Sequence, residues 1–273
     1  HQQEIAFLSS ICEPDFGYIT NFGKAHLEGF GSIEGVVKGK SELYEYLITN
    51  DKHVFLNADD TIQKEKLSHY IKKFGFSQND INYFKIEFLE ANPFVSFKIE
   101  DTLIKSHLIG EYNFTNLCAA TIIGKYFNVD LPEIKKAIEN YIPTNNRSQI
   151  IEKNSNTIIL DAYNANPSSM EVALKNFSKQ KQQHKVAILG DMFELGSSAS
   201  KEHQKIANLA TSLTFETILL VGENFYKTEI KNSKVKKYQS FEDFKIDFKP
   251  IKNSTLLIKG SRGMALERVL ELL

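Results

Sequence analysis

The first candidate chemistry lies in a short glycine-rich loop that carries His26 and Glu28. An apolar segment over 16–21 precedes the loop and predicts a buried strand, and a helix is expected to begin at Ser32. A loop from a strand to a helix lies at the carboxyl edge of a sheet, where α/β proteins bind ligands. Lys40 follows on the predicted helix. Taken by themselves, a single histidine in a loop and a lysine on a helix are more often solvated surface residues.

Four further polar side chains could contact the adenine, the ribose and the phosphates of a nucleotide. Asn113 and Asn116 stand at i, i+3 near the start of a predicted helix, so both amides lie on one face and suit an adenine edge. Capping of that helix by Asn113 is the structural alternative. Asp161 ends a predicted strand, where a carboxylate can bind a ribose diol. Arg147 lies in a polar linker, and its guanidinium is either solvated or directed at a phosphate.

The elements expected around these residues alternate as they do in α/β proteins. The early part of the chain predicts a mostly parallel sheet with covering helices, from strands over 16–21 and 54–57 and helices over 2–12, 32–47 and 61–74. A change to alternating apolar residues then predicts three antiparallel strands, at 83–88, 94–99 and 103–109. Helices over 112–127 and 132–141 complete this part.

A break in periodicity at 142–146 separates two expected domains, 1–143 and 147–273. The second predicts a Rossmann-like α/β domain with strands over 157–161, 185–189, 217–221 and 255–259 and helices over 168–177, 201–213 and 264–272. The loops after these strands carry polar and charged residues, so they form a second candidate ligand edge.

Composition excludes several classes of function. A net charge of −1 and a pI near 6.7 give no basic surface for nucleic acid or anionic lipid. The two cysteines match neither a disulfide framework nor a zinc site. No apolar run approaches the length of a membrane span, and we find no signal peptide, so we expect a cytoplasmic protein. We expect it to be a monomer.

These motifs together resemble the Mur ligases, ATP-dependent amide-forming enzymes of peptidoglycan precursor synthesis. The resemblance rests on the loop His26-Leu27-Glu28-Gly29-Phe30-Gly31-Ser32, on the pattern Gly110-x-x-Asn113-x-x-Asn116, and on the string Tyr163-Asn164-Ala165-Asn166-Pro167. The last string is the most specific. It points to the member that adds D-alanyl-D-alanine to a UDP-N-acetylmuramoyl-tripeptide, rather than to those adding alanine, glutamate or diaminopimelate.

The resemblance implies ATP and Mg²⁺ as cofactors and a site for each. His26 would ligate the magnesium, and Lys40 would be carbamylated, because a carbamate is an anion whose oxygens suit this hard cation. Both would be catalytic. Asn113 and Asn116 would contact adenine, although Glu111-Tyr112 stands where Arg or Lys followed by His is usual. Arg147, preceded by Asn146 where the family has Gly, and Asp161 would contact the phosphate and the ribose.

The acceptor amine is expected at loops that follow strands of the second domain. Two further strings there resemble the family, 190–196 and 259–262. The residues assigned to the acceptor are Tyr163, Asn164, Asn166, Lys259, Ser261 and Arg262. Glu194 and His203 accompany them, and we expect His203 to be a cap or a surface residue.

The glycine-rich phosphate loop that the family needs is absent. The segment 35–41 comes close to Gly-x-x-x-x-Gly-Lys-[Ser/Thr], but its spacing is one residue short and it lies inside a predicted helix. We therefore expect the later part of a P-loop-type central domain plus the C-terminal domain of a longer ligase, inactive by itself. The alternatives are another Mur ligase or a folylpolyglutamate synthase, against which the 163–167 string argues, and a non-catalytic nucleotide- or partner-binding protein.

Overall fold

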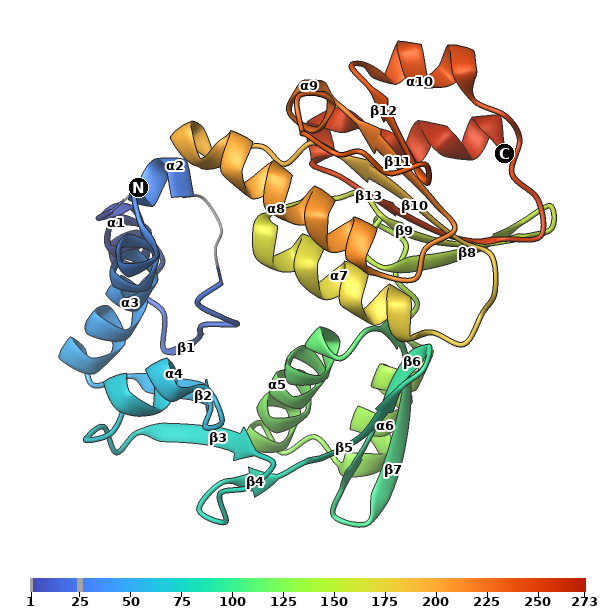
Figure 1. Cartoon of the computed structure of the whole chain (residues 1–273). Coiled ribbons are helices and arrows are strands. Elements are labelled where there is room, and N and C mark those ends of the chain that lie inside the picture. The colour runs from blue at the N-terminus through green and yellow to red at the C-terminus, as the bar shows by residue number, and fades with distance from the viewer. Residues whose placement is uncertain (1, 24–26) are drawn as a thin grey trace. The chain divides into compact units, whose positions relative to one another are not determined.

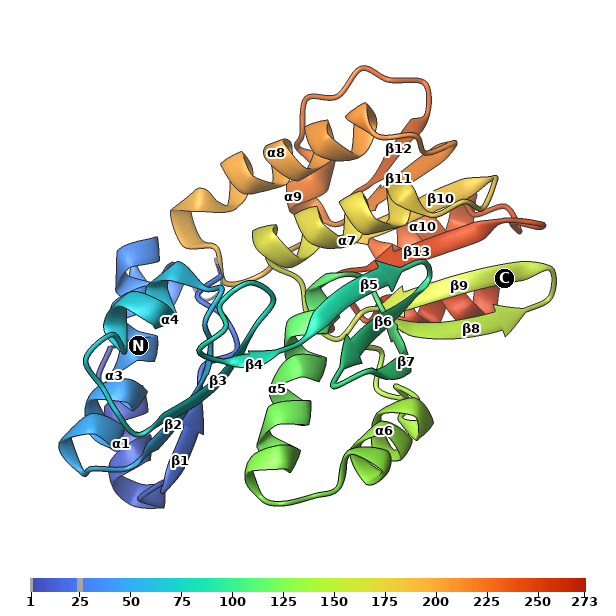
Figure 2. The same ribbon diagram turned by 90° about the horizontal axis from the view of Figure 1, so that it is seen from below.

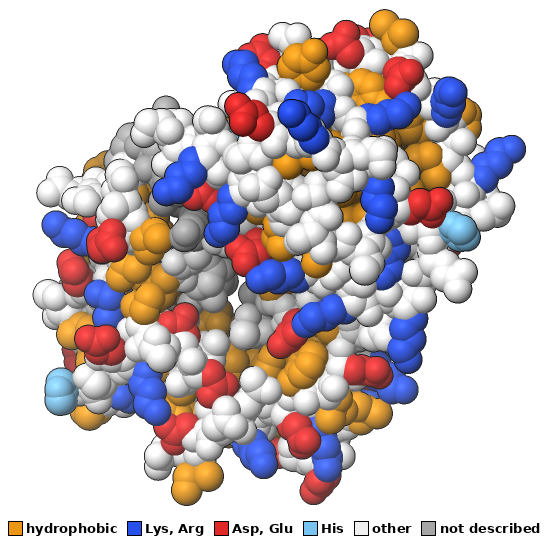
Figure 3. Space-filling model, in the orientation of Figure 1, with side chains coloured by type: hydrophobic (Ala, Val, Ile, Leu, Met, Phe, Trp, Pro, Cys, Tyr) orange, Lys and Arg blue, Asp and Glu red, His pale blue; other side chains and the backbone are white. Residues whose placement is uncertain are grey.

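The computed structural model describes residues 2–23 and 27–273 and divides into two compact units, His1–Tyr141 and Ile142–Leu273 (Figure 1). Each unit has its own sheets and its own hydrophobic core. None of the described helices is long and apolar enough to cross a membrane. On the face drawn in Figure 3, acidic and basic side chains are interspersed, as the near-zero net charge predicts.

A parallel sheet of order β1-β2-β3-β4 forms the first part of the N-terminal unit (Figure 2). Its strands are β1 (Phe16–Tyr18), β2 (His53–Asn57), β3 (Lys73–Ser77) and β4 (Phe84–Lys85). The helices of this part are α1 (Glu4–Cys12), α2 (Leu27–Phe30), α3 (Ile33–Thr49) and α4 (Thr61–Lys66). Val54, Leu56 and Leu47 are buried together between β2 and α3. The predicted strand–helix alternation is thus confirmed.

The long helix α3 begins where the sequence predicted. Ser32 is its N-cap, and the Ser32 hydroxyl oxygen accepts a hydrogen bond from the Gly35 amide at 3.1 Å. The helix expected over 61–74 is wrong in its second half, because α4 ends at Lys66 and β3 begins at Lys73. Pairing of β3 with β2 outweighs the local helical pattern there. Gly75 fits against Leu56, where a Cβ atom would lie 2.7 Å from the Leu56 carbonyl oxygen.

A separate antiparallel sheet of order β5-β6-β7 follows in the same unit. Its strands are β5 (Glu87–Ala91), β6 (Phe94–Ile99) and β7 (Thr102–Ile109), and helices α5 (Tyr112–Tyr126) and α6 (Leu131–Asn140) come next. Val95, Phe97 and Phe114 are buried in one core between the sheet and α5. The strand expected over 83–88 is wrong as a single element, because β4 belongs to the parallel sheet and only β5 to this one.

The C-terminal unit is built on one sheet of order β12-β11-β10-β13-β9-β8. Its strands are β8 (Gln149–Lys153), β9 (Asn156–Asp161), β10 (Lys185–Gly190), β11 (Thr217–Val221), β12 (Val235–Tyr238) and β13 (Thr255–Lys259). All neighbours are parallel except β8, which pairs antiparallel with β9. The four predicted strands are confirmed, and β8 and β12 extend the sheet at its two edges.

Helices cover both faces of this sheet, as a doubly wound fold requires (Figures 1 and 2). They are α7 (Pro167–Lys179), α8 (Ala199–Ser212), α9 (Glu223–Tyr226) and α10 (Phe241–Asp247), with 3₁₀ turns η1 (Gly196–Ser198), η2 (Arg262–Met264) and η3 (Leu266–Leu272). The α-helix predicted over 264–272 is wrong in type. Ala265 adopts a left-handed conformation with φ of 46° and separates two 3₁₀ segments.

The parallel order brings four strand ends to one edge. The loops after β9, β10, β11 and β13 all leave the sheet at its carboxyl edge, where doubly wound proteins place ligands. Gly190 ends β10, and Gly260 directly follows β13, the neighbouring strand. A Cβ atom on Gly260 would lie 3.1 Å from the Gly190 Cα, so glycine allows the two loops to start in contact.

Candidate nucleotide and acceptor sites

Lys40 is half-buried on α3 and lies against the loop that follows β1. Its Nζ donates a hydrogen bond to the Asn21 carbonyl oxygen at 2.7 Å. Burial lowers the pKa of Lys40 below that of a free lysine. A lower pKa raises the fraction of neutral amine, which is the form that reacts with carbon dioxide to give a carbamate. His26, its predicted partner at a magnesium site, lies outside the described residues.

Asn113 and Asn116 lie on one face at the start of α5, as their spacing predicted. The Asn116 Nδ2 donates to the Asn113 Oδ1 at 3.2 Å, and the Asn113 Nδ2 donates to the Ile109 carbonyl oxygen at 2.8 Å. Asn113 is buried, whereas Asn116 is exposed. Asn113 does not cap α5, since the helix begins after Glu111. The adenine assignment stays a prediction, with Asn116 as the accessible amide.

Asp161 and Lys259 form an ion pair at the carboxyl edge of the C-terminal sheet. They stand opposite each other in the register of β9 and β13, and the Lys259 Nζ lies 2.7 Å from the Asp161 Oδ2. The Lys259 side chain is 3% exposed, and the Asp161 side chain is 15% exposed. The Asp161 Oδ1 also accepts from the Ser148 amide at 3.2 Å, and Lys259 donates to the Asn164 carbonyl oxygen at 3.1 Å. The pair therefore ties the linker and the 162–166 loop to the sheet.

Arg147 stacks on Tyr163. Its guanidinium carbon lies 3.8 Å from the ring centroid, and the Tyr163 amide donates to the Asn146 carbonyl oxygen at 3.2 Å. This contact over the ring face restrains the guanidinium, and an arginine in such a contact keeps N–H groups free to donate hydrogen bonds. Such a fixed fork of donors suits a phosphate or a carboxylate. Two residues assigned from separate motifs are thereby brought together.

The other side chains of the 162–166 loop and the first turn of α7 shape the local backbone. The Asn166 side chain caps α7 by accepting from the Ser169 amide at 2.9 Å, and the Ser169 hydroxyl accepts from the Asn166 amide at 3.1 Å. This reciprocal pair is a capping box, which fixes where the helix begins. The Asn164 Oδ1 accepts from the Ala165 amide at 2.8 Å. Substrate contacts by Asn164 and Asn166 stay predictions.

Ser261 joins three of the strand-end loops. Its hydroxyl accepts a hydrogen bond from the Phe193 amide at 2.8 Å and lies 3.4 Å from the Ala165 carbonyl oxygen, to which it donates. Its own amide donates to the Asp191 carbonyl oxygen at 3.1 Å. Ser261 is buried, whereas the neighbouring Arg262 is exposed and pairs with Glu267 at 3.1 Å. Strings far apart in the sequence therefore meet at one buried hydroxyl.

Asp191 is a positioning residue within the 190–196 string, to which the sequence assigned no separate role. Its buried carboxylate accepts from the amides of Asn224 and Phe225, each at 2.9 Å, and from the Asn224 side chain at 3.0 Å. Gly222, with φ of 125°, leaves room for this carboxylate. A glycine–aspartate pair directly after a buried strand was the available signal. Through Asp191 the β10 loop is fixed to the β11 loop.

His203 lies beneath this network and is fully buried, so the expectation of a cap or surface residue was wrong. Its Nε2 accepts from the Met192 amide at 2.9 Å, so the proton sits on Nδ1, which donates to the Ala199 carbonyl oxygen at 2.7 Å. Burial lowers the pKa of His203 despite the Ala199 hydrogen bond and the nearby Asp191 carboxylate. The imidazole is therefore neutral and structural.

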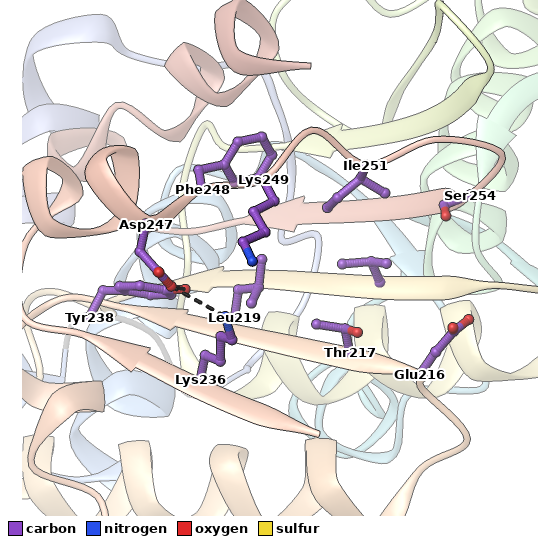
Figure 4. A pocket seen from close by; sticks show the side chains of 11 residues that line it. Glu216, Thr217, Leu219, Lys236, Tyr238, Asp247, Phe248, Lys249, Ile251 and Ser254 are labelled. Atoms are coloured by element: carbon purple, nitrogen blue, oxygen red, sulfur yellow. Dashed lines mark hydrogen bonds and ion pairs between the residues drawn. The ribbon is translucent and has the colours of Figure 1, made fainter. Parts of the chain in front are cut away.

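A hollow of about 300 Å³ in the C-terminal unit lies away from this edge (Figure 4). It runs along the sheet face toward α10 and reaches Thr217 and Ser254 at the amino ends of β11 and β13. Tyr238 and Lys236 both contact Asp247 within it. None of the predicted site residues lines this hollow. Among the described residues, no group of three or more His, Cys, Asp or Glu side chains is placed to hold a metal.

The structure therefore consists of two α/β domains, and the second gathers polar loops at the carboxyl edge of its sheet. Residues 1–124 match the Mur ligase middle domain, and residues 146–262 match the Mur ligase glutamate ligase domain. The chain belongs to the Mur ligase family and carries its middle and C-terminal domains.

Named relatives agree along the whole chain. A UDP-N-acetylmuramoyl-tripeptide–D-alanyl-D-alanine ligase of Buchnera aphidicola is 31% identical over 98% of this chain, and that of Escherichia coli is 29% identical over 100%. A crystal structure of MurF from Acinetobacter baumannii superposes with a TM-score of 0.82 at 26% identity and covers 100% of this chain. The chain spans 62%, 63% and 62% of these proteins respectively.

The Asp161–Lys259 ion pair predicts a large loss of stability when one partner is removed. Lys259→Met leaves a carboxylate that is only 15% exposed without its cation, and we expect the free energy of unfolding to fall by about 3 kcal/mol. The double variant Asp161→Asn, Lys259→Met should recover part of that loss. Urea unfolding followed by circular dichroism measures both. Lys175→Met removes only an exposed pair with Glu171 and should cost at most about 0.5 kcal/mol; an equal loss in both lysine variants would contradict the assignment.

Because His203 is buried and neutral, we expect the folded protein to be less stable in mild acid. Since its folded pKa lies below the ordinary value of 6.5, the unfolded chain takes up a proton below pH 6.5 that the folded chain does not. Stability should therefore fall as the pH drops through this range, until the folded pKa is reached. Unfolding midpoints between pH 8 and 5 should show a flatter profile for His203→Gln. The exposed His184→Gln is the control, and an unchanged slope in His203→Gln would refute the neutral buried imidazole.

Proposed function

We propose that this chain is part of an ATP-dependent ligase that adds D-alanyl-D-alanine to a UDP-N-acetylmuramoyl-tripeptide in peptidoglycan precursor synthesis. In the first step, an oxygen of the terminal tripeptide carboxylate attacks the γ-phosphorus of ATP, giving an acyl phosphate and ADP. In the second, the amine of D-alanyl-D-alanine attacks the acyl carbon, loses a proton and expels phosphate. The relatives that support this are longer than the chain, so the activity is proposed for a longer protein.

One observation supports the acceptor part of this proposal above the others. The three strings most like this ligase, at 162–169, 190–196 and 259–262, are joined through the Ser261 hydroxyl and amide. They come from three different strand ends of one sheet. A chain that kept the fold for stability alone would have no need for polar strings to converge at the edge where ligands bind.

The proposed roles follow from exposure and contacts. Arg147, held on the Tyr163 ring, offers its N–H fork to a phosphate. Arg262 is exposed beside Ser261 and suits the acceptor carboxylate. Asp161 is proposed for the ribose, with its second oxygen held by Lys259. Asn116, with Asn113 behind it, is proposed for adenine. ADP is bound by a MurF from Thermotoga maritima, a protein of the same fold.

A magnesium ion is proposed from the chemistry of the donors. The Lys40 ammonium cannot ligate a cation, but its carbamate would supply oxygens, and the lowered pKa of Lys40 favours that modification. His26 is the second proposed ligand. When bound, the ion would neutralise negative charge on the phosphates. The hydrogen bond to Asn21 orients the Lys40 side chain, and Gly39 allows the ring of Phe30 to pack directly against α3 next to Lys40.

Since ATP and a UDP-linked substrate are needed, we propose a cytoplasmic location.

Phosphate release by the longer protein tests this function. We expect release that requires ATP, the muramyl-tripeptide and D-alanyl-D-alanine together, and no turnover by residues 1–273 alone, which lack a phosphate loop. Release with glutamate or diaminopimelate in place of the dipeptide would indicate another Mur ligase. Nucleotide binding without release under any combination would indicate a binding protein.

Lys40 predicts a rescue that an ordinary lysine would not show. In the longer protein, Lys40→Ala should lower activity by on the order of 100-fold, because an oxygen ligand is lost. Added acetate or formate should restore part of it by occupying the vacated position. Lys38→Ala, an exposed lysine on the same helix, is the control and should keep activity. Full activity of Lys40→Ala without added carboxylate would refute the role.

A further inference from the structure

Phe193 is a large apolar side chain left half-exposed at the carboxyl edge. It follows Met192 in the loop after β10, and 43% of its surface is open to solvent. Its neighbours Asp191 and Met192 are buried, so the exposure belongs to Phe193 itself and not to a loose loop. A single exposed ring is ordinary on a protein surface. One that is held rigidly at a ligand edge is a candidate for recognition.

The ring and backbone of Phe193 are both fixed. Its amide donates to the buried Ser261 hydroxyl at 2.8 Å. Its ring lies on Gly263, where a Cβ atom would stand 2.7 Å from the ring Cε2. Any side chain at position 263 would therefore push the ring away. The ring is preorganised by a glycine, which lowers the cost of using it in binding.

A charged side chain stands beside the glycine on which the ring lies. Arg262 directly precedes Gly263 and is exposed, and its guanidinium pairs with the Glu267 carboxylate at 3.1 Å. A second cation near this glycine, Lys259 at the end of β13, is buried and paired with Asp161. A dipeptide of alanine offers matching groups, because it carries a carboxylate at one end and two methyl groups. Apolar contact with a methyl group is the feature that distinguishes such a dipeptide from diglycine.

We propose that Phe193, seated on Gly263, determines acceptor specificity by packing its ring against the methyl groups of the dipeptide. Arg262 on the adjacent turn holds the dipeptide carboxylate. The proposal rests on the proposed function and adds a specificity-determining residue to it. Ser261 is a positioning residue in this arrangement, since it acts through the Phe193 backbone.

Competition between two acceptors tests the proposal in the longer protein. With D-alanyl-D-alanine and diglycine supplied together, mass spectrometry of the products gives the ratio of their kcat/KM values. Phe193→Ala should lower the preference for D-alanyl-D-alanine by roughly tenfold, with KM for ATP and for muramyl-tripeptide unchanged. Phe193→Leu keeps an apolar side chain and should retain most of the preference. Ile246→Ala, which truncates an exposed side chain on α10, is the control.

Gly263→Ala provides a second test. Its methyl group displaces the ring without removing it, so by itself it should lower the preference for D-alanyl-D-alanine. Added to Phe193→Ala, it should lower that preference no further. An additive effect of the two substitutions, or an unchanged preference in Phe193→Ala, would overturn the proposal. A changed KM for muramyl-tripeptide would overturn it as well. A wild-type protein that uses neither dipeptide would instead overturn the proposed function.

Discussion

The largely buried ion pair between Asp161 and Lys259 is the interaction on which the ligand edge of the C-terminal unit depends. It joins the ends of the paired strands β9 and β13, with the Lys259 Nζ 2.7 Å from the Asp161 Oδ2. Each partner also holds a loop, Asp161 through the Ser148 amide and Lys259 through the Asn164 carbonyl. Removing two charges from water is costly unless both are paired and hydrogen-bonded. The same ion pair therefore restrains the chain before β9, at Ser148, and after β9, at Asn164.

Burial divides the residues of this edge into those that position and those that can meet a ligand. Lys259, Ser261 and Asp191 are buried and satisfied by other loops. Arg262 and Tyr163 are exposed, with Arg147 stacked on the latter. The positioning residues are charged or polar because they must hold backbone amides and carbonyls of several loops at once, which an apolar core residue cannot do.

Most strands were predictable from the sequence, because buried parallel strands appear as apolar runs, and so were the polar strings that follow them. The end of α4 at Lys66 was not, since only pairing with β2 makes 73–77 a strand. The burial of His203 was not predictable either, because the residues around it on the helix do not show which loops pack against it. The Asp161–Lys259 pair needed the strand order, which places β13 beside β9 from nearly a hundred residues away.

Amide hydrogen exchange at the strand-end loops tests most directly whether this edge is a rigid, preformed platform. The amides of Phe193 and Phe225 lie in or beside loops and donate only to side-chain oxygens, those of Ser261 and Asp191. We expect both to exchange nearly as slowly as amides within β10 and β13, since opening them requires the network to break. Exchange at the rate of an open surface loop, with β10 and β13 still protected, would contradict the account.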